Sequence, residues 1–207
     1  MNRPRPTFRM TLALMLLGFA AGLFAAEADP QAAASARLAE LQQHYGESHP
    51  KVIDQRLRVA EIQRLTKLAV PEPPVLRAAR VELVVMQARY GTKHPKLRAQ
   101  AARVSGMEEQ FWLFPASPPE LLEAQAELAA ISLRYGETNP RLATAQSRVL
   151  ALEKYLLAPS AEPKELRLAR AELEQLSDRY GLNHPKLQQA AERITTLEQG
   201  RAVASGQ

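Results

Sequence analysis

The chain contains no cysteine among its 207 residues. Disulfide bonds, thiolate metal sites, a cysteine nucleophile and a lipid anchor on cysteine are therefore excluded. Aromatic residues are scarce, at 5% of the chain, and the apolar residues are mostly alanine and leucine. A composition of this kind favours thin helix-on-helix packing over a deep globular core.

Signatures of catalysis are also missing. The sequence has no glycine-rich phosphate loop, no paired-carboxylate motif, no nucleophile elbow and no cluster of metal ligands. We therefore predict a non-enzymatic protein without a cofactor or a metal. The net charge of +5 falls to +3 if residues 1–28 are removed, since three arginines and one glutamate leave with them. A charge this mild gives little support to nucleic-acid binding.

Residues 1–28 have the pattern of a signal peptide. The basic stretch MNRPRPTFR precedes an apolar run of 17 residues, MTLALMLLGFAAGLFAA, and the small residues Ala26 and Ala28 flank Glu27 at its end. We predict cleavage after Ala28 and export to the periplasm or out of the cell. The alternative is an uncleaved membrane anchor, although the run is shorter than the roughly 20 residues that span a bilayer. No second long apolar run follows, so we expect no membrane span in the exported chain.

One short phrase occurs four times along the chain. It reads HYGESHPKV around Tyr45, RYGTKHPKL around Tyr90, RYGETNPRL around Tyr135 and RYGLNHPKL around Tyr180. The four tyrosines are 45 residues apart in every case. A fixed period of this length is the signature of a tandem repeat protein.

Apolar residues on both sides of the phrase follow helical spacing. Seven and four residues before the tyrosines stand Leu38, Leu83, Leu128 and Leu173, and then Leu41, Met86, Ile131 and Leu176. After the prolines, Val52, Leu97, Leu142 and Leu187 are followed seven residues later by Val59, Val104, Val149 and Ile194. Such steps place each set on one face of a helix. Each unit is therefore predicted to be two helices joined by a short turn, which must fold back antiparallel.

The repeated phrase has the residues of a helix-to-helix turn. The glycines, Gly46, Gly91, Gly136 and Gly181, are expected to take a left-handed conformation just past the first helix. The prolines, Pro50, Pro95, Pro140 and Pro185, suit the first turn of the second helix. The preceding residues, His49, His94, Asn139 and His184, are predicted to be its N-caps. Because asparagine is a preferred N-cap and replaces histidine here, we interpret the histidines as caps and not as metal ligands or general bases.

Proline-rich segments, VPEPPV, PASPPE and PSAEP, separate the units. We therefore predict an all-α fold of four tandem antiparallel helical hairpins with a 45-residue period, stacked as a solenoid or an extended array. The predicted hairpins are residues 29–70, 71–115, 116–159 and 160–202, and residues 203–207 are predicted to be a disordered tail. The sequence leaves open whether the stack is curved, straight or closed, and whether the chain forms an oligomer.

Charged residues recur with the same period. The second helices carry Arg58, Arg103, Arg148 and Arg193, and the first helices carry Glu82, Glu127 and Glu172. Folding a hairpin back brings these positions level, so they are predicted to pair across it, each pair contributing about 0–1 kcal/mol. Basic residues also gather at the turns, as Lys51, Lys96, Arg141 and Lys186 together with the arginines before the tyrosines, Arg89, Arg134 and Arg179. They form either a solvated face or a patch for an anionic envelope polymer, with Lys96 and Arg141 as the candidate contacts.

All phenylalanine and tryptophan after residue 28 falls in FWLF, residues 111–114, at the junction of the second and third units. Aromatic side chains dominate many protein interfaces, so Phe111, Trp112 and Phe114 are the candidate partner-binding residues. The alternative is that these side chains fill the seam between two hairpins.

The phrase RYGxxHPKL, followed by a heptad-like helix that contains LE, resembles the periplasmic coiled-coil segments of the chain-length-determinant (polysaccharide co-polymerase) family. The resemblance covers about 25 of the 45 residues of each unit, and the second membrane span and kinase-like portion of that family are missing here. It implies an exported helical hairpin in an envelope-polymer setting. The phrase is also similar, more weakly, to one in tetratricopeptide repeats, whose period of about 34 residues is shorter.

The sequence thus predicts an exported, non-enzymatic scaffold or protein-interaction module of the bacterial envelope, with an unidentified protein partner. The alternative is a structural envelope component that binds glycan or peptidoglycan through its basic hairpin ends.

Overall fold

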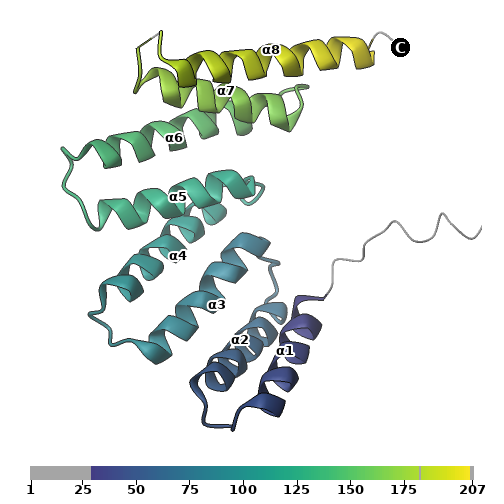
Figure 1. Ribbon diagram of the computed structural model, residues 1–207, viewed down its shortest axis with the longest axis vertical. Coiled ribbons are helices and arrows are strands. Elements are labelled where there is room, and N and C mark those ends of the chain that lie inside the picture. Colours follow the sequence, from purple (N-terminus) through teal and green to yellow (C-terminus); the bar gives the residue numbers. More distant parts are fainter. Residues whose placement is uncertain (1–28, 182, 206–207) are drawn as a thin grey trace, which may run out of the picture.

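The computed structural model describes residues 29–181 and 183–205, and these contain eight helices and no strand (Figure 1). The predicted all-α class is confirmed. The helices are α1 (Pro30–His44), α2 (Pro50–Thr66), α3 (Pro74–Arg89), α4 (Pro95–Leu113), α5 (Pro119–Ser132), α6 (Pro140–Leu156), α7 (Lys164–Ser177) and α8 (Pro185–Ser205). Seven of the eight begin at a proline, which suits the first helical position because the amide there has no partner within the helix.

Each helix packs against the next one along the chain, and α3 also contacts α5. Figure 1 shows the helices following one another along the long axis of the molecule. The turns after α3 and α5 (residues 90–94 and 135–139) lie along one edge, which we call the turn edge. The connections after α4 and α6 (residues 114–118 and 157–163) lie along the opposite edge, which we call the linker edge.

In every turn between paired helices, the residue before the proline caps the second helix. Nδ1 of His49, His94 and His184 accepts a hydrogen bond from the backbone N–H of Lys51, Lys96 and Lys186, at 3.2 Å in each case. Oδ1 of Asn139 accepts the equivalent bond from Arg141 at 2.9 Å. The predicted N-cap role is confirmed. In three turns the tyrosine ring stacks on the capping histidine, with ring centroids 4.0 to 4.3 Å apart.

The prediction that the turn glycines adopt a left-handed conformation is wrong. No described glycine has a positive φ. Helix α1 is instead followed by Tyr45 as its C-cap, which is extended (φ −133°, ψ 146°) while its N–H still donates to the carbonyl of Leu41. The carbonyl of Gly46 then accepts a hydrogen bond from the N–H of His49 at 2.9 Å, which closes the turn. In the first two turns the change of direction therefore comes from an extended tyrosine, Tyr45 or Tyr90, and nothing in the structure explains why glycine follows it.

The described residues contain two clusters of buried side chains that share helix α5. One cluster joins α3, α4 and α5 through Leu76, Val104, Met107, Phe111, Leu122 and Ala126. The other joins α5, α6 and α7 through Leu121, Ala124, Val149, Ala151, Leu152, Leu156 and Ala171. The adjacent residues Leu121 and Leu122 are both 0% exposed and belong to different clusters. Helix α5 is therefore buried on two faces and connects the two halves of the structure.

Helices α4 and α5 approach each other very closely at Gly106. A Cβ atom placed on Gly106 would lie 2.9 Å from Cβ of Ala129 and 2.9 Å from the backbone oxygen of Gln125. The other units have Glu61, Ala151 and Thr196 at the corresponding position. This close crossing is therefore specific to the junction of the second and third units, and it requires a residue without a side chain.

Ion pairs that the sequence analysis did not anticipate tie the linkers to the helices. Arg80 lies 3.0 Å from Glu72 and 2.9 Å from Glu108, and Arg170 makes the corresponding contacts with Glu162 and Glu198, both at 2.9 Å. In the third unit, Gln125 replaces the arginine and donates to Gln110 and Glu153, both at 3.2 Å. The same three positions are therefore polar in the last three units. The linker has Glu72, Ser117 or Glu162, the first helix has an arginine or Gln125, and the second helix has a glutamate.

The two ends of the chain relate differently to the predictions. The predicted signal peptide, residues 1–28, lies outside the described residues. Helix α8 continues to Ser205, although residues 203–207 were predicted to be a disordered tail. Within the described ranges, no helix has both the length and the hydropathy that a membrane span requires.

Candidate binding surfaces

The four residues of FWLF divide between the core and the surface. Phe111 is 4% exposed and packs in the cluster of α3, α4 and α5, so it fills the seam as the alternative interpretation proposed. Trp112, Leu113 and Phe114 are 64%, 65% and 48% exposed at the end of α4. We call these three residues the aromatic patch. It lies on the linker edge, and only two of the three predicted partner-binding residues belong to it.

We expect acrylamide to quench the fluorescence of Trp112 about as strongly as it quenches free tryptophan in solution, because the indole ring is mostly exposed. Trp112 is the only tryptophan of the chain, so the fluorescence reports on this side chain alone. Weak quenching of the purified protein would mean that another surface covers the ring.

The basic residues of the turn edge reach back to the tyrosines. Nη1 of Arg141 donates a hydrogen bond to the hydroxyl of Tyr135 at 2.9 Å, and Nζ of Lys51 donates to that of Tyr45 at 3.3 Å. The guanidinium carbon of Arg141 also lies 5.6 Å from the Tyr135 ring centroid, within the range of a cation–π contact. Lys96 is exposed in the first turn of α4. Both predicted polymer-binding residues therefore lie at the turn edge, away from the aromatic patch.

Two of the three predicted ion pairs within hairpins are present. Arg148 lies 2.7 Å from Glu127, and Arg193 lies 3.0 Å from Glu172. The third is not formed, because Glu82 pairs at 2.6 Å with Arg58 of the preceding unit and not with Arg103. The three glutamates therefore pair with Arg58, Arg148 and Arg193. Arg103 is the one that has no carboxylate partner among the described residues.

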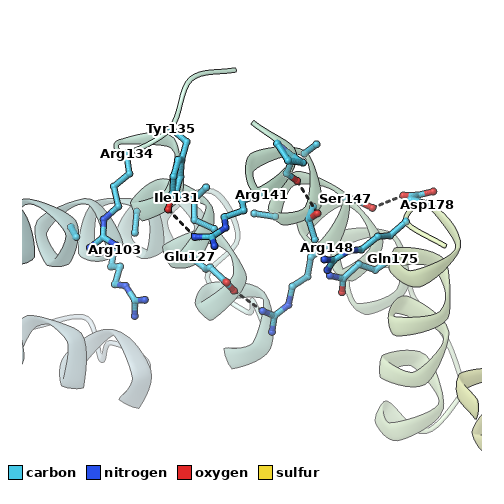
Figure 2. Close-up of a pocket in the computed structure, with 17 residues that line it drawn as sticks. Arg103, Glu127, Ile131, Arg134, Tyr135, Arg141, Ser147, Arg148, Gln175 and Asp178 are labelled. Atoms are coloured by element: carbon cyan, nitrogen blue, oxygen red, sulfur yellow. Dashed lines mark hydrogen bonds and ion pairs between the residues drawn. The ribbon is translucent and has the colours of Figure 1, made fainter. Parts of the chain in front are cut away.

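An open groove of about 1110 Å³ crosses α4, α5, α6 and α7 near the turn edge (Figure 2). Its lining includes the five arginines Arg103, Arg134, Arg141, Arg148 and Arg179, and two carboxylates, Glu127 and Asp178. Small and apolar side chains between them include Ala99, Ala130, Ile131 and Ala145. We call this the arginine groove. Figure 2 shows Arg103 and Arg134 on one side of it and Gln175 and Asp178 on the other.

Both carboxylates of the arginine groove already have partners. Glu127 pairs with Arg148, and Asp178 accepts a hydrogen bond from the hydroxyl of Ser147. In the described part of the chain, neither Arg103 nor Arg134 has a side-chain hydrogen bond or an ion pair. The groove therefore carries excess positive charge, because only Arg148 among its five arginines pairs with a carboxylate among the described residues.

The sequence analysis did not identify Arg103 and Arg134 as site residues. It assigned Arg103 to an ion pair and treated Arg134 as part of a basic turn. The surplus of one arginine over the glutamates was visible in the sequence, but not which arginine is left over. Of the predicted site residues, the structure brings Arg141 into this groove, and Lys96 is not part of its lining.

Residues 29–181 and 183–205 contain no group of three or more histidine, aspartate or glutamate side chains placed to hold a metal ion. No protein-family model, curated protein or solved structure matches the chain. A functional proposal therefore depends on the aromatic patch and the arginine groove themselves.

Proposed function

We propose that the chain is a non-enzymatic helical-repeat scaffold that binds a partner protein in the bacterial envelope. Four tandem hairpins with a 45-residue period, stacked as a solenoid, form the scaffold. The succession of eight helices and the recurring N-caps support this arrangement. The envelope setting rests on the signal-peptide pattern of residues 1–28.

The aromatic patch is the observation that carries this proposal. Large apolar side chains exposed together are typical of interaction surfaces, and tryptophan is prominent among the residues that dominate binding energy. The neighbouring Phe111 is buried between α3, α4 and α5, which fixes the end of α4. Trp112 and Phe114 are therefore held in an ordered position, so that binding of a partner loses little conformational entropy in this segment.

Crosslinking in cells, followed by mass spectrometry and sugar analysis of the material that co-purifies with the tagged protein, tests the proposal. We expect one defined protein partner, which is lost when Trp112 and Phe114 are both changed to alanine. Leu150→Ala is the matched control, because it removes an apolar side chain of α6 that is also 65% exposed but lies outside the patch. Capture that is unchanged in the double variant would contradict a role for the patch.

The turn edge supports a second candidate function, the binding of an anionic envelope glycan or peptidoglycan. The observation in its favour is the excess of arginines over carboxylates in the arginine groove, together with exposed Lys96. Recovery of polymer without a protein partner in the crosslinking experiment would favour this function over the first.

A further inference from the structure

The unpaired state of Arg103 is an exception within the repeat. At the corresponding positions, Arg58, Arg148 and Arg193 each contact a glutamate, at 2.6, 2.7 and 3.0 Å. The glutamate that could pair with Arg103 from the following unit is Glu127, which Arg148 already holds. The arginine at this repeat position therefore pairs with a carboxylate in the other three units, and Arg103 has no such partner among the described residues.

Arg134 lacks its partner for a different reason. The corresponding Arg89 of the second unit forms a two-point pair with Asp54, in which Nε lies 2.9 Å from Oδ1 and Nη2 contacts Oδ2. The residue of the next unit that corresponds to Asp54 is Ala99. Ala99 lines the arginine groove and is 6% exposed, much as Asp54 is 7% exposed. The groove thus has Ala99 at the position where, one unit earlier, Asp54 neutralises Arg89.

A smaller space of about 360 Å³ at the first turn is lined by Asp54, Arg58 and Arg89 among others. Each of its lining residues stands 90 positions before a residue of the arginine groove, where Thr144 and Arg179 take the places of Asp54 and Arg89. The arginine groove, of about 1110 Å³, also includes Ala99 and Arg103, and it lacks the carboxylate of Asp54 at both Ala99 and Thr144.

We propose that the arginine groove binds an acidic peptide segment of another protein, with one carboxylate on Arg103 and another on Arg134. Glu82, the partner of Arg58, is the internal counterpart of the first carboxylate. Asp54, the partner of Arg89, is the internal counterpart of the second. Guanidinium groups pair with carboxylates through two parallel hydrogen bonds, which gives such a site direction as well as charge.

The lining of the groove favours a peptide over an acidic polysaccharide. Ala143 is exposed and Ile131 is half-buried in the lining of the groove. Apolar side chains of a peptide can pack on this surface between the charged contacts. Sugar hydroxyls placed there would lose water without receiving hydrogen bonds in exchange, which is unfavourable.

This site is distinct from the aromatic patch. Trp112 lies nine residues beyond Arg103 on α4, which is about 14 Å along the helix at 1.5 Å per residue. A failure of the aromatic patch to bind a partner would therefore leave this proposal intact, and the reverse also holds.

The test begins with a phage library of random peptides panned on the immobilised full-length chain. We expect enriched sequences to carry an excess of aspartate and glutamate. The best of them, labelled with fluorescein, is then titrated with the protein at low and high salt by fluorescence anisotropy. Binding should weaken with salt, because it depends on charge. Absence of enrichment, or enrichment of peptides that are not acidic, would overturn the proposal.

Four variants locate the binding. Arg103→Gln and Arg134→Gln should each weaken binding of the labelled peptide roughly tenfold or more, since each removes a hydrogen bond to a charged group. Ala99→Asp should weaken it similarly while leaving the thermal unfolding midpoint intact, because the new carboxylate occupies Arg134 as Asp54 occupies Arg89. Arg98→Gln is the matched control, an exposed arginine of α4 that does not line the groove.

Trp112→Ala should bind the labelled peptide as the unchanged protein does, which separates this site from the aromatic patch. Equal affinities for all four groove and control variants would overturn the proposal. Tighter binding of fluorescein-labelled alginate, lost in Arg103→Gln and Arg134→Gln, would also overturn it and assign the groove to an acidic glycan.

Discussion

Replacing Leu122 with alanine is expected to lower the free energy of unfolding by about 2–5 kcal/mol, the range measured for buried leucines. Leu122 is completely buried in the cluster formed by α3, α4 and α5, next to Phe111. Its neighbour Leu121 fills the cluster on the other side of α5. The cavity cannot close easily, because α5 is held on both faces and has little freedom to shift toward it.

Urea unfolding followed by circular dichroism measures this effect. Leu150→Ala is the control, since Leu150 lies on α6 with most of its surface exposed and its loss should change the free energy by no more than about 0.5 kcal/mol. Similar losses for the two variants would show that α5 is not the helix on which the two clusters depend. The comparison should be read from the unfolding midpoint at constant slope, because a change in slope would mean that the compactness of the unfolded or folded state has changed or that the transition is no longer two-state.

The structure within each unit was largely predictable, because it depends on residues that are close in sequence. In the second helices, Val52, Leu97, Val104, Leu142 and Val149 are all at most 7% exposed, as the helical spacing implied, whereas the leucines seven residues before the tyrosines are half-buried. The N-caps also follow from local chemistry, since the side chain before each proline accepts a hydrogen bond from the backbone N–H two positions on. The failed prediction for the glycines is local as well: several backbone conformations can reverse the chain, and residue type alone did not distinguish them.

Packing between units was not predictable, because the repeat period says nothing about how closely two helices cross. The position of Leu122 is occupied by Arg77 and Arg167 in the neighbouring units. From sequence alone it would be grouped with these arginines at the edge of the helix, whereas it is packed in the cluster of α3, α4 and α5. Arg77 and Arg167 are half-buried at this position, whereas Leu122 is completely buried in the unit where α4 and α5 cross closely.

The same limit applies to the candidate sites. Aromatic residue type was enough to select FWLF, but only the rotation of α4 decides that Phe111 faces the core and Trp112 faces solvent. For the arginine groove, the sequence reveals more arginines than glutamates, but each glutamate has a possible partner in its own unit and another in the unit before. Which pair forms depends on distances between helices, so the identity of the unpaired arginine required the structure.

Replacing Gly106 with valine is expected to lower the free energy of unfolding by about 1–3 kcal/mol or more, the usual cost of forcing extra methyl groups into a packed interface. The first added carbon alone would lie 2.9 Å from both Ala129 and Gln125, and the latter contact is with backbone. Helices α4 and α5 would have to separate. The loss should exceed any gain in helix propensity, because glycine and valine differ by only a few tenths of a kcal/mol in a helix.

Gly200→Val is the matched control, because it makes the same change in α8, where an added Cβ has no atom within 4 Å. It should leave the free energy of unfolding within about 0.5 kcal/mol of its original value. Equal effects of the two substitutions would contradict the close crossing. Because Arg103 and Trp112 flank Gly106 on the same helix, a displaced α4 should also weaken acidic-peptide binding in Gly106→Val, while Gly200→Val keeps it. Loss of stability with undiminished peptide binding would mean that the crossing supports the core but does not position the groove.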